Sequence, residues 1–584
     1  MPEGPADAAS ASLEVPAPPG QASRWPLVHG LAITLFGFLS GFFHIHNTSI
    51  GWHLASGRWI LEHWAVPRSD PFTFTAAGQP WLDHEWLFQI LVALVEGVAG
   101  VPGLVVLRAS LTAAIALLLY GLARRSGLVA PAAMLLSGGC VLGARLRFFL
   151  RPELLTLLLV VAAIGLYLQR RPARTWPAAI GLVTLLAANC HGAALLIPIL
   201  LSVALAGDLL VAWRTPPAER PPLRPALLAV AASWLAPLCN PAGWRLYAAP
   251  LRLAHLIGQP YIPNPEWISP GPRQVPSLYL ALLAAAVVLA LRERHPRQWL
   301  LLVVSAALAL RYVRNVGVFF VLLPLVVAPA LASWARLARS AEGRIRWPVH
   351  ALSLLVVMAT TTALVAWPWP PFGAALSDER YPRRACDFLD SHRLPSGPLY
   401  NDVNFGGYLI ERYYPARQAF IDDRNEVHER LLEEIWQILQ RSDQRAWQAL
   451  LDRYGVEVAL LRYHPPLQVL APNGSSRGER GFSALWFPAS RWALVYWDDV
   501  AMVLIRRKAL AAADPALEEF RVVRPDDLDF VARQLASGAI DRGACARELE
   551  RAIRLAPAGR RATALARVLL VAPGPPPLGS SEGH

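Results

Sequence analysis

Residues 46–87 read HNTSIGWHLASGRWILEHWAVPRSDPFTFTAAGQPWLDHEWL and lie between the first two strongly apolar segments of the chain. A plain connector between membrane helices would be short, but this stretch holds five Trp, three His after His46, and the acids Glu62, Asp70, Asp83 and Glu85. Amphipathic aromatic side chains belong at the bilayer interface, and ionisable groups crowded beside lipid need a functional reason. The stretch therefore predicts a large loop that is the working surface of a membrane enzyme.

The composition also indicates a membrane protein. Of the 584 residues, 54% are hydrophobic and 17% are charged, which is too apolar for an ordinary soluble protein. Eleven apolar segments are predicted to cross the membrane, although several are shorter than the roughly 17 residues usually required. They are residues 27–45, 103–122, 128–143, 152–168, 177–189, 192–213, 225–239, 276–291, 298–310, 315–334 and 349–368.

The arginines between these segments predict the orientation of the chain. With the N-terminus inside, every second connector is basic, as the positive-inside rule requires. These connectors hold Arg124, Arg125, Arg170, Arg171, Arg174, Arg214, Arg220, Arg224, Arg292, Arg294, Arg297, Arg336, Arg339, Arg344 and Arg346. Because the arginines cluster between apolar spans, the net charge of +13 does not predict nucleic-acid binding. The loop 46–87 and everything after residue 368 are expected on the opposite, periplasmic or extracellular, side.

Hydrophobic density divides the chain into four parts. Residues 1–24 are rich in Ala, Pro and Gly and predict a disordered cytoplasmic tail, not a cleaved signal. Residues 25–369 form the predicted transmembrane domain, which includes the loop 46–87. Hydrophobic density then drops, so residues 370–510 predict an outer, periplasmic α/β domain, and residues 511–584 a helical C-terminal tail. The five Cys are scattered without paired spacing and indicate neither a disulfide framework nor a zinc site.

Some arginines depart from the orientation pattern because they lie in predicted outer connectors. They are Arg145, Arg147, Arg151, Arg245, Arg311 and Arg314. A guanidinium group matches phosphate oxygens, so one interpretation is a cationic rim that binds a lipid-linked phosphate or pyrophosphate. The alternative is that these side chains extend to lipid headgroups or pair with Glu153 and Glu266.

The loop has a predicted internal structure. Residues 50–63 predict a helix that lies in the plane of the membrane interface. Prolines then end this helix, residues 72–75 alternate as a short extended piece, and Asp83 is placed to cap the helix that follows.

Three acids of the loop, Asp70, Asp83 and Glu85, are the candidate catalytic residues. A carboxylate beside His and Trp suits one chemistry, in which it takes the proton of a sugar-acceptor hydroxyl as general base while aromatic faces stack on a sugar ring. His53 and His84 lie nearby and are candidate substrate-binding residues. The alternative for each acid is structural, because Asp83 also suits a helix cap and Asp70 a turn.

Further candidate substrate-binding residues lie outside the loop. His191 falls at the turn between the fifth and sixth apolar segments, and Glu266 lies in the outer segment 240–275. A lone His at a helix end is usually structural, which is the alternative for His191. A divalent metal would draw on the loop acids and histidines, but adjacent residues rarely coordinate one ion together. No cofactor is therefore assigned, and a divalent metal is kept as an option.

With these residues in view, the sequence resembles the GT-C membrane glycosyltransferases. Their shared plan implies a multispan helical body, a large first outer loop with a catalytic carboxylate, and often a soluble domain on the same side. It also implies a polyprenyl-phosphate sugar or a lipid-linked oligosaccharide as donor. Over nearly its whole length the chain resembles a group of bacterial membrane proteins without an assigned activity. The motifs that carry this resemblance are GWHLASGRWI, PRSDPFTFT, PWLDHEWL, Asn240-Pro241, RYVRN, NDVNFGGYLI and FIDDR.

One position departs from that resemblance. The related proteins carry an Asp two residues before a Trp-Trp-His step, which reads GWH at residues 51–53 here, and this chain has Ser49 in its place. A Ser hydroxyl cannot act as a carboxylate base. The resemblance therefore implies either that one of the three loop acids does the work or that this chain has lost the activity.

The predicted outer domain alternates strands and helices. Strands are expected at 399–401, 419–421, 456–462, 492–497 and 501–506, with helices at 405–412, 426–439, 444–453 and within 526–571. Asn401-Asp402 and Asp422-Asp423-Arg424 fall at strand C-ends, where open α/β sheets place ligands. Gly406-Gly407 either cradles a ligand or permits a tight approach. The domain thus either binds an acceptor or glycan or forms a rigid cap over the membrane cavity.

The expected fold is an α-helical polytopic membrane protein of about eleven spans, GT-C-like, with a C-terminal α/β domain on the outer face. The expected function is transfer of a sugar from a polyprenyl-phosphate-linked donor to a lipid, polysaccharide or protein on the outer face of a bacterial cytoplasmic membrane. The expected partners are the lipid-linked sugar and membrane lipid, and the oligomeric state does not follow from the sequence. The alternative is a transporter or a non-catalytic scaffold. A transporter should carry charges at mid-membrane and related halves, neither of which is clear here, and a scaffold would tolerate loss of all three loop acids.

Overall fold

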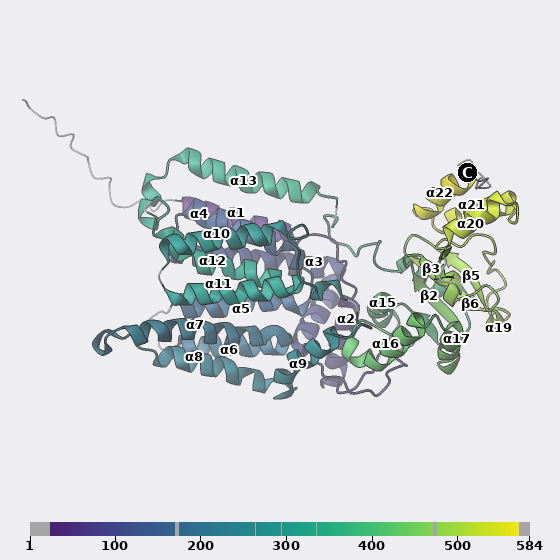
Figure 1. Ribbon diagram of the computed structural model, residues 1–584, viewed down its shortest axis with the longest axis horizontal. Helices are drawn as coiled ribbons and strands as arrows, with labels where there is room; N and C mark the ends of the chain where they lie inside the picture. The colour runs from purple at the N-terminus through teal and green to yellow at the C-terminus, as the bar shows by residue number, and fades with distance from the viewer. Residues whose placement is uncertain are drawn as a thin grey trace, which may run out of the picture.

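The computed structural model describes residues 24–169, 175–262, 264–293, 295–334, 336–368, 370–470 and 476–571. Figure 1 shows a body of long, roughly parallel helices and, at one end of it, a smaller domain formed by the C-terminal part of the chain. We call that end of the helical body the domain-bearing end. Four predictions fall outside the described residues: the tail up to residue 23, the arginines at 170, 171 and 174, Arg294, and the disordered end of the chain.

Each of the eleven predicted apolar segments contains a helix. These helices are α1 (Trp25–Gly41), α3 (Trp86–Arg125), α4 (Ala130–Ala144), α5 (Pro152–Gln169), α6 (Trp176–Cys190), α7 (Leu196–Arg214), α8 (Arg224–Leu235), α10 (Pro276–Arg292), α11 (Pro296–Arg311), α12 (Val316–Ala332) and α13 (Trp347–Ala366). In the described residues, five helical segments are long and apolar enough to cross a membrane, judged by length and composition. The total number of spans stays a prediction.

Helix α3 starts well before the second predicted apolar segment, which began at residue 103. It runs from Trp86 across Gly100, where φ is 59° and ψ is −158°, and continues past Pro102. Gly adopts this backbone region readily, and Pro suits the first turn of the helical piece that follows because its missing N–H needs no partner there. The hydropathy pattern was interrupted at this break, although the helix continues on both sides of it.

The loop 46–87 contains the predicted interfacial helix, α2 (Ile50–His63). The extended piece predicted at 72–75 is reduced to one bridge, in which Thr73 pairs with Ala419 of the C-terminal domain. Because this bridge is its one pairing of this kind in the described residues, the strand predicted at 419–421 is wrong. That segment pairs with the loop at this single bridge and then turns, so it builds no ladder with the sheet.

The C-terminal domain is built on a four-stranded sheet with the order β1-β2-β6-β5. Its strands are β1 (Leu399–Asn401), β2 (Val458–Arg462), β5 (Trp492–Trp497) and β6 (Ala501–Arg506). β1 pairs parallel with β2, and the other two pairings are antiparallel. β5 and β6 are buried along their whole length, which requires cover on both faces of the sheet.

Helices and a hairpin surround this sheet. They are α14 (Arg383–Ser391), α15 (Val403–Tyr413), α16 (Asn425–Gln440), α17 (Gln444–Arg453), α18 (Phe482–Trp486), α19 (Arg507–Leu510), α20 (Leu528–Ala536), α21 (Arg542–Leu555), α22 (Arg561–Ala566) and the hairpin β3 (Leu467–Leu470) with β4 (Ser476–Arg480). The helices predicted within the C-terminal domain are therefore confirmed. Trp447 and Trp492 are fully buried in its core.

The C-terminal domain packs directly on the loop. A Cβ atom added to Gly51 of α2 would overlap the carbonyl oxygen of Gly407 in α15, and one added to Gly407 would overlap the carbonyl oxygen of Thr48. The glycine pair Gly406-Gly407 thus permits a tight backbone approach, the second of its two predicted roles. One hydrophobic cluster includes Ile50 from the loop and Leu409 from α15, so the two parts share a core.

Candidate functional site

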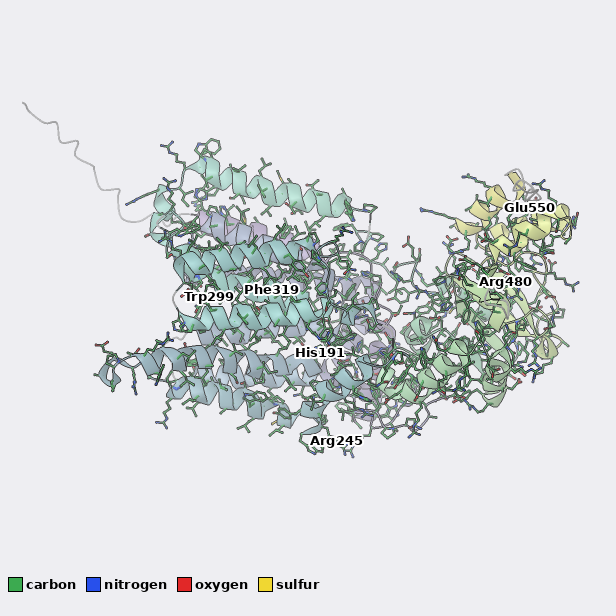
Figure 2. The ribbon with its side chains drawn as sticks, in the orientation of Figure 1. His191, Arg245, Trp299, Phe319, Arg480 and Glu550 are labelled. Carbon is green, nitrogen blue, oxygen red and sulfur yellow. The ribbon has the colours of Figure 1, made fainter. Side chains whose placement is uncertain are left out.

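Glu85 lies immediately before helix α3 at the domain-bearing end, surrounded by three histidines. Its carboxylate oxygens lie 3.7 Å from Nδ1 of His53, 3.8 Å from Nε2 of His84 and 3.8 Å from Nε2 of His191. These distances are too long for direct hydrogen bonds. Figure 2 labels His191 where the helical body meets the C-terminal domain. Three of the predicted substrate-binding residues thus converge on one predicted catalytic acid.

The position of each histidine has a local cause. His53 is carried by α2, and His191 follows α6 with its Nδ1 3.2 Å from the hydroxyl of Thr156. His84 lies against Gly192, where an added Cβ would come within 2.9 Å of His84 Nε2. Gly192, the residue after His191, therefore makes room for a histidine of the loop.

Burial controls the charge of this cluster. Burial and the charge of Glu426 raise the pKa of Glu85 to about 8, although Arg314 and Arg151 act in the opposite direction. Burial, assisted by Arg151, lowers the pKa of His53 well below its usual value. At neutral pH the acid is therefore largely protonated and this histidine is neutral.

Asp83 is enclosed and accepts hydrogen bonds at the start of α3. Its Oδ1 accepts from the side-chain amide of Gln89 at 2.7 Å and from the backbone N–H of Glu85 at 3.3 Å. It is 5% exposed, and burial together with the charge of Glu85 raises its pKa to about 7. The N-cap residue of α3 is Glu85 and the helix has no side-chain cap, so the predicted cap by Asp83 is wrong; Asp83 instead holds Gln89 and the backbone just before the helix.

Asp70 lies in a buried ion-pair network that joins the loop to the C-terminal domain. Its Oδ1 accepts from Nη2 of Arg424 at 2.8 Å, and the same guanidinium group pairs with Asp422 at 2.5 Å. His428 lies 3.4 Å from Asp422, and the Arg424 guanidinium lies 4.5 Å from the centre of the Trp81 ring. Both side chains of the Asp70–Arg424 pair are almost fully buried. Asp70 is therefore engaged in a buried contact between the loop and the C-terminal domain, and its catalytic role stays a prediction.

The arginines near Glu85 are mostly paired, which is the alternative that the sequence analysis named. Arg147 pairs with Glu153 at 2.8 Å and with Glu266 at 3.2 Å, and Arg151 pairs with Glu266 at 2.8 Å. Burial would raise the pKa of Glu266, but Arg151 and Arg147 outweigh it and hold that pKa at about 2. Arg314 lies 3.7 Å from Glu153. The result is an ionised network of three arginines and two glutamates.

The other predicted arginines lie apart from this network. Arg145 lies over the ring of Phe43 at 5.3 Å, and Arg311 over the ring of Tyr312 at 4.7 Å. Neither forms an ion pair within the described ranges. Arg245 begins the exposed helix α9 (Arg245–Ile257), at the margin of the helical body in Figure 2.

One acid near the site was missing from the predicted set. Asp423 Oδ1 accepts a hydrogen bond from the indole N–H of Trp52 at 2.8 Å. Burial and the charge of Asp422 raise the pKa of Asp423 to about 6. The FIDDR motif had suggested a ligand site at a strand end, but no local pattern could show that it faces the loop.

Ser49, which stands where the resembling proteins carry an acid, is buried beside the start of α2. Its hydroxyl and the Oδ1 atom of Asn47 have no hydrogen-bond partner within the described part of the chain. No group of three or more His, Cys, Asp or Glu side chains in those residues is arranged to hold a metal ion. A divalent metal stays a prediction, and we derive no step through one.

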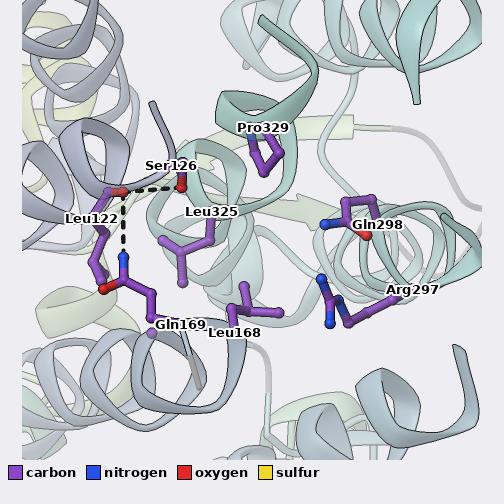
Figure 3. A pocket seen from close by; sticks show the side chains of 9 residues that line it. Leu122, Ser126, Leu168, Gln169, Arg297, Gln298, Leu325 and Pro329 are labelled. Atoms are coloured by element: carbon purple, nitrogen blue, oxygen red, sulfur yellow. Dashed lines mark hydrogen bonds between the residues drawn. The ribbon is translucent and has the colours of Figure 1, made fainter. Parts of the chain in front are cut away.

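A separate cavity lies at the opposite end of the helical body. Its lining, shown in Figure 3, includes Ser126, which follows the last residue of α3, together with Gln169 and Gln298. Glu85 precedes the first residue of the same 40-residue helix. The piece of α3 that follows the break at Gly100 alone extends roughly 38 Å to Ser126 at 1.5 Å per residue, so the cavity lies at the far end of this piece and is not part of the cluster around Glu85.

Comparison with known proteins gives the fold. A scan against protein-family models and a search of curated proteins found no match. The chain is similar to the solved structure of the oligosaccharyltransferase AglB from Archaeoglobus fulgidus in complex with an inhibitory peptide and a dolichol-phosphate. The identity is 12%, the TM-score is 0.52, and the match covers 81% of this chain and 79% of that chain. The apo form of the A. fulgidus enzyme gives 11% identity, a TM-score of 0.53, and coverage of 81% and 80%. ArnT from Cupriavidus metallidurans bound to undecaprenyl phosphate gives 12% identity, a TM-score of 0.44, and coverage of 83% and 98%.

The likeness to AglB spans about four fifths of both chains. The protein therefore shares the fold of this oligosaccharyltransferase, a body of apolar helices of membrane-spanning length with a small C-terminal sheet domain, which agrees with the architecture that the sequence predicted. A shared fold does not define a reaction, so the activity has to be argued from the site residues.

Proposed function

We propose that the protein transfers a sugar from a polyprenyl-phosphate-linked donor to a lipid, polysaccharide or protein acceptor. The observation that carries the proposal is Glu85, a partly accessible carboxylate among three histidines where the helical body meets the C-terminal domain. The dolichol-phosphate in the AglB complex supports a polyprenyl-linked donor for a protein of this fold. We place the reaction at the domain-bearing end, on the outer face of the cytoplasmic membrane.

Glu85 is the proposed general base. In the transfer step its ionised carboxylate takes the proton of the acceptor hydroxyl while the acceptor oxygen bonds to the anomeric carbon. The bond between that carbon and the phosphate oxygen breaks, and the lipid phosphate leaves with the electron pair. With a pKa of about 8 only a minor fraction of Glu85 is ionised at neutral pH, but that fraction is a stronger base than an ordinary carboxylate, and proton transfer is most effective when the pKa lies near the working pH.

Arg151 and Arg314 are the proposed ligands of the leaving phosphate. The positive charges of both lower the pKa of Glu85, and about a quarter of each side chain is exposed. Arg147 is only 4% exposed and is held by two glutamates, which suits a supporting role. Guanidinium groups stabilise the negative charge that grows on a departing phosphate.

The test is binding and turnover of a panel of polyprenyl-phosphate sugars by the purified full-length protein, with Glu85→Gln beside the wild type. We expect Glu85→Gln to abolish transfer while binding of bare polyprenyl phosphate survives, and Arg151→Gln to weaken that binding. Asp378→Asn, on an exposed surface acid, is the control and should change neither property.

Two outcomes would contradict the proposal. Lipid binding by the wild type without turnover over a broad donor and acceptor panel would identify a non-catalytic scaffold. No binding of any lipid phosphate would leave a transporter or scaffold of another component as the better description.

A further inference from the structure

Asp423 is the one carboxylate of the FIDDR motif that the buried ion-pair network leaves unused. Asp422 is paired with Arg424 and His428, whereas Asp423 makes no ion pair among the residues that the structure describes. Its side chain is partly exposed. Oδ1 accepts a hydrogen bond from the indole N–H of Trp52, and Oδ2 has no side-chain partner in the described residues, which leaves it for a ligand.

Trp52 holds Asp423 in a defined place because the indole itself is fixed. Its ring lies 3.7 Å from that of His53 and 6.1 Å from that of Trp81, between centroids, and it is 9% exposed. The Arg424 guanidinium lies 5.8 Å from the same ring. A carboxylate held by a rigid donor is preorganised, so this side chain loses little conformational entropy when it binds a ligand.

Asp423 and Glu85 belong to one electrostatic site. The charge of Asp423 contributes to the raised pKa of Glu85, and the charge of Arg151 acts to lower the pKa of both carboxylates. His53 packs against Trp52, the partner of Asp423, and lies 3.7 Å from Glu85 through Nδ1; it is 2% exposed, and this Nδ1 has no hydrogen-bond partner in the described structure. A buried polar atom without a partner, aimed into a charged space, indicates a place where a ligand supplies the missing hydrogen bond.

We infer that the C-terminal domain contributes a sugar-binding residue to this site: Asp423 accepts hydrogen bonds from hydroxyl groups of the transferred sugar while Trp52 fixes its position. The inference rests on the proposed function and names the part of the donor that this domain recognises. A sugar hydroxyl donates well to a carboxylate, and a hydrogen bond to a charged acceptor is worth more than one to a neutral acceptor.

The test compares the binding of two lipids to the full-length protein in detergent. One is undecaprenyl phosphate, and the other is undecaprenyl phosphate carrying glucose, mannose or arabinose. The wild type is expected to bind at least one glycosylated lipid more tightly than the bare lipid. Asp423→Asn should weaken binding of that glycosylated lipid by roughly tenfold and leave the Kd of the bare lipid unchanged.

The substitution is chosen to separate ligand binding from structure. The amide oxygen of Asn still accepts from the Trp52 indole, so the packing is kept, and an unchanged Tm checks this. Asp402→Asn is the matched control, because Asp402 also follows a strand of the C-terminal domain but caps α15 and pairs with His464. It should change neither affinity.

The outcomes distinguish this inference from the proposed function. Equal weakening of both lipids by Asp423→Asn, or no weakening of either, would overturn the role of Asp423 while leaving the role of Glu85 in place. Equal affinity of the wild type for bare and glycosylated lipid would overturn it as well. Failure of the wild type to bind any of the lipids would overturn both.

Discussion

At the scale of single residues, the chemistry of the site depends on which carboxylates are free and which are engaged. Asp70, Asp83 and Glu85 look alike in the sequence, but they occupy three different environments. Asp70 is paired with a buried Arg424, Asp83 accepts from the start of α3, and Glu85 has charged or ionisable neighbours on several sides without a direct hydrogen bond to any of the three histidines. Of the three, Glu85 is the one whose side chain is partly exposed, at 16%, which is why we propose it as the reacting carboxylate.

The raised pKa of Glu85 predicts how stability depends on pH. Below the ordinary pKa of 4.5 the group is protonated in both the folded and the unfolded chain. As the pH rises toward about 8, the unfolded chain loses a proton that the folded chain keeps, so the free energy of unfolding falls. Glu85→Gln cannot ionise and avoids this loss. We expect its Tm to exceed that of the wild type by more at pH 8 than at pH 5, measured by thermal unfolding in detergent. A Tm difference that is constant with pH would contradict the assignment.

Asp70→Asn distinguishes a structural from a catalytic role for Asp70. The substitution leaves the buried Arg424 with one carboxylate instead of two; removing one partner of a buried ion pair costs about 3–5 kcal/mol, and the remaining Asp422 reduces that cost here. We expect a clear drop in Tm, with any loss of transfer following the loss of structure. Asp378→Asn removes an exposed carboxylate that also pairs with an arginine and should leave the Tm within error. Loss of transfer by Asp70→Asn at an unchanged Tm would instead make Asp70 a reacting group.

The sequence was informative about the loop and about the residue types of the site, because Trp, His and acids beside apolar spans stand out in composition. It was uninformative about which acid is free. Asp70 and Arg424 are 354 positions apart, and Trp52 and Asp423 are 371 positions apart, so no local pattern records either contact. The positions of the arginines were predictable, but their pairing with Glu153 and Glu266 was one of two open alternatives until the structure brought them together.

At the scale of elements, the contact between α2 and α15 connects the membrane body to the C-terminal domain. Local pattern was enough to predict both helices, because apolar spacing and turn residues bound them. The strand expected at 419–421 failed because a strand exists only through its partners, and this segment meets the loop at one bridge. The glycines show why the contact is close: each lies where the other backbone leaves no room for a side chain.

Gly407→Ala should separate these two elements. Its Cβ would overlap the carbonyl oxygen of Thr48, a backbone atom that cannot rotate away, and overpacking of this kind costs about 1–3 kcal/mol. We expect a lower Tm and faster proteolytic release of the C-terminal domain. Gly121→Ala is the matched control, because an added Cβ there meets nothing within 4 Å and Ala favours the helix. Equal protease resistance of the two variants would show that the contact does not hold the domain in place.

At the scale of the whole molecule, the proposed function requires the domain-bearing end to face outward, where a lipid-linked sugar would be used. The arginine pattern predicts this orientation, and it can be tested because the chain offers few competing thiols. Four of the five cysteines are buried and one, Cys239, is exposed. In a Cys239→Ser background, single cysteines can be introduced at Ala77 in the loop and at Ser340 in the connector between α12 and α13, both of which are exposed. We expect a membrane-impermeant maleimide to label Ala77→Cys in intact cells, and Ser340→Cys only after the membrane is opened. The reverse labelling pattern would show the opposite membrane orientation and would contradict the outer-face location of the proposed reaction. Labelling of both positions in intact cells would contradict the assumption that the two ends of the helical body lie on opposite sides of the membrane.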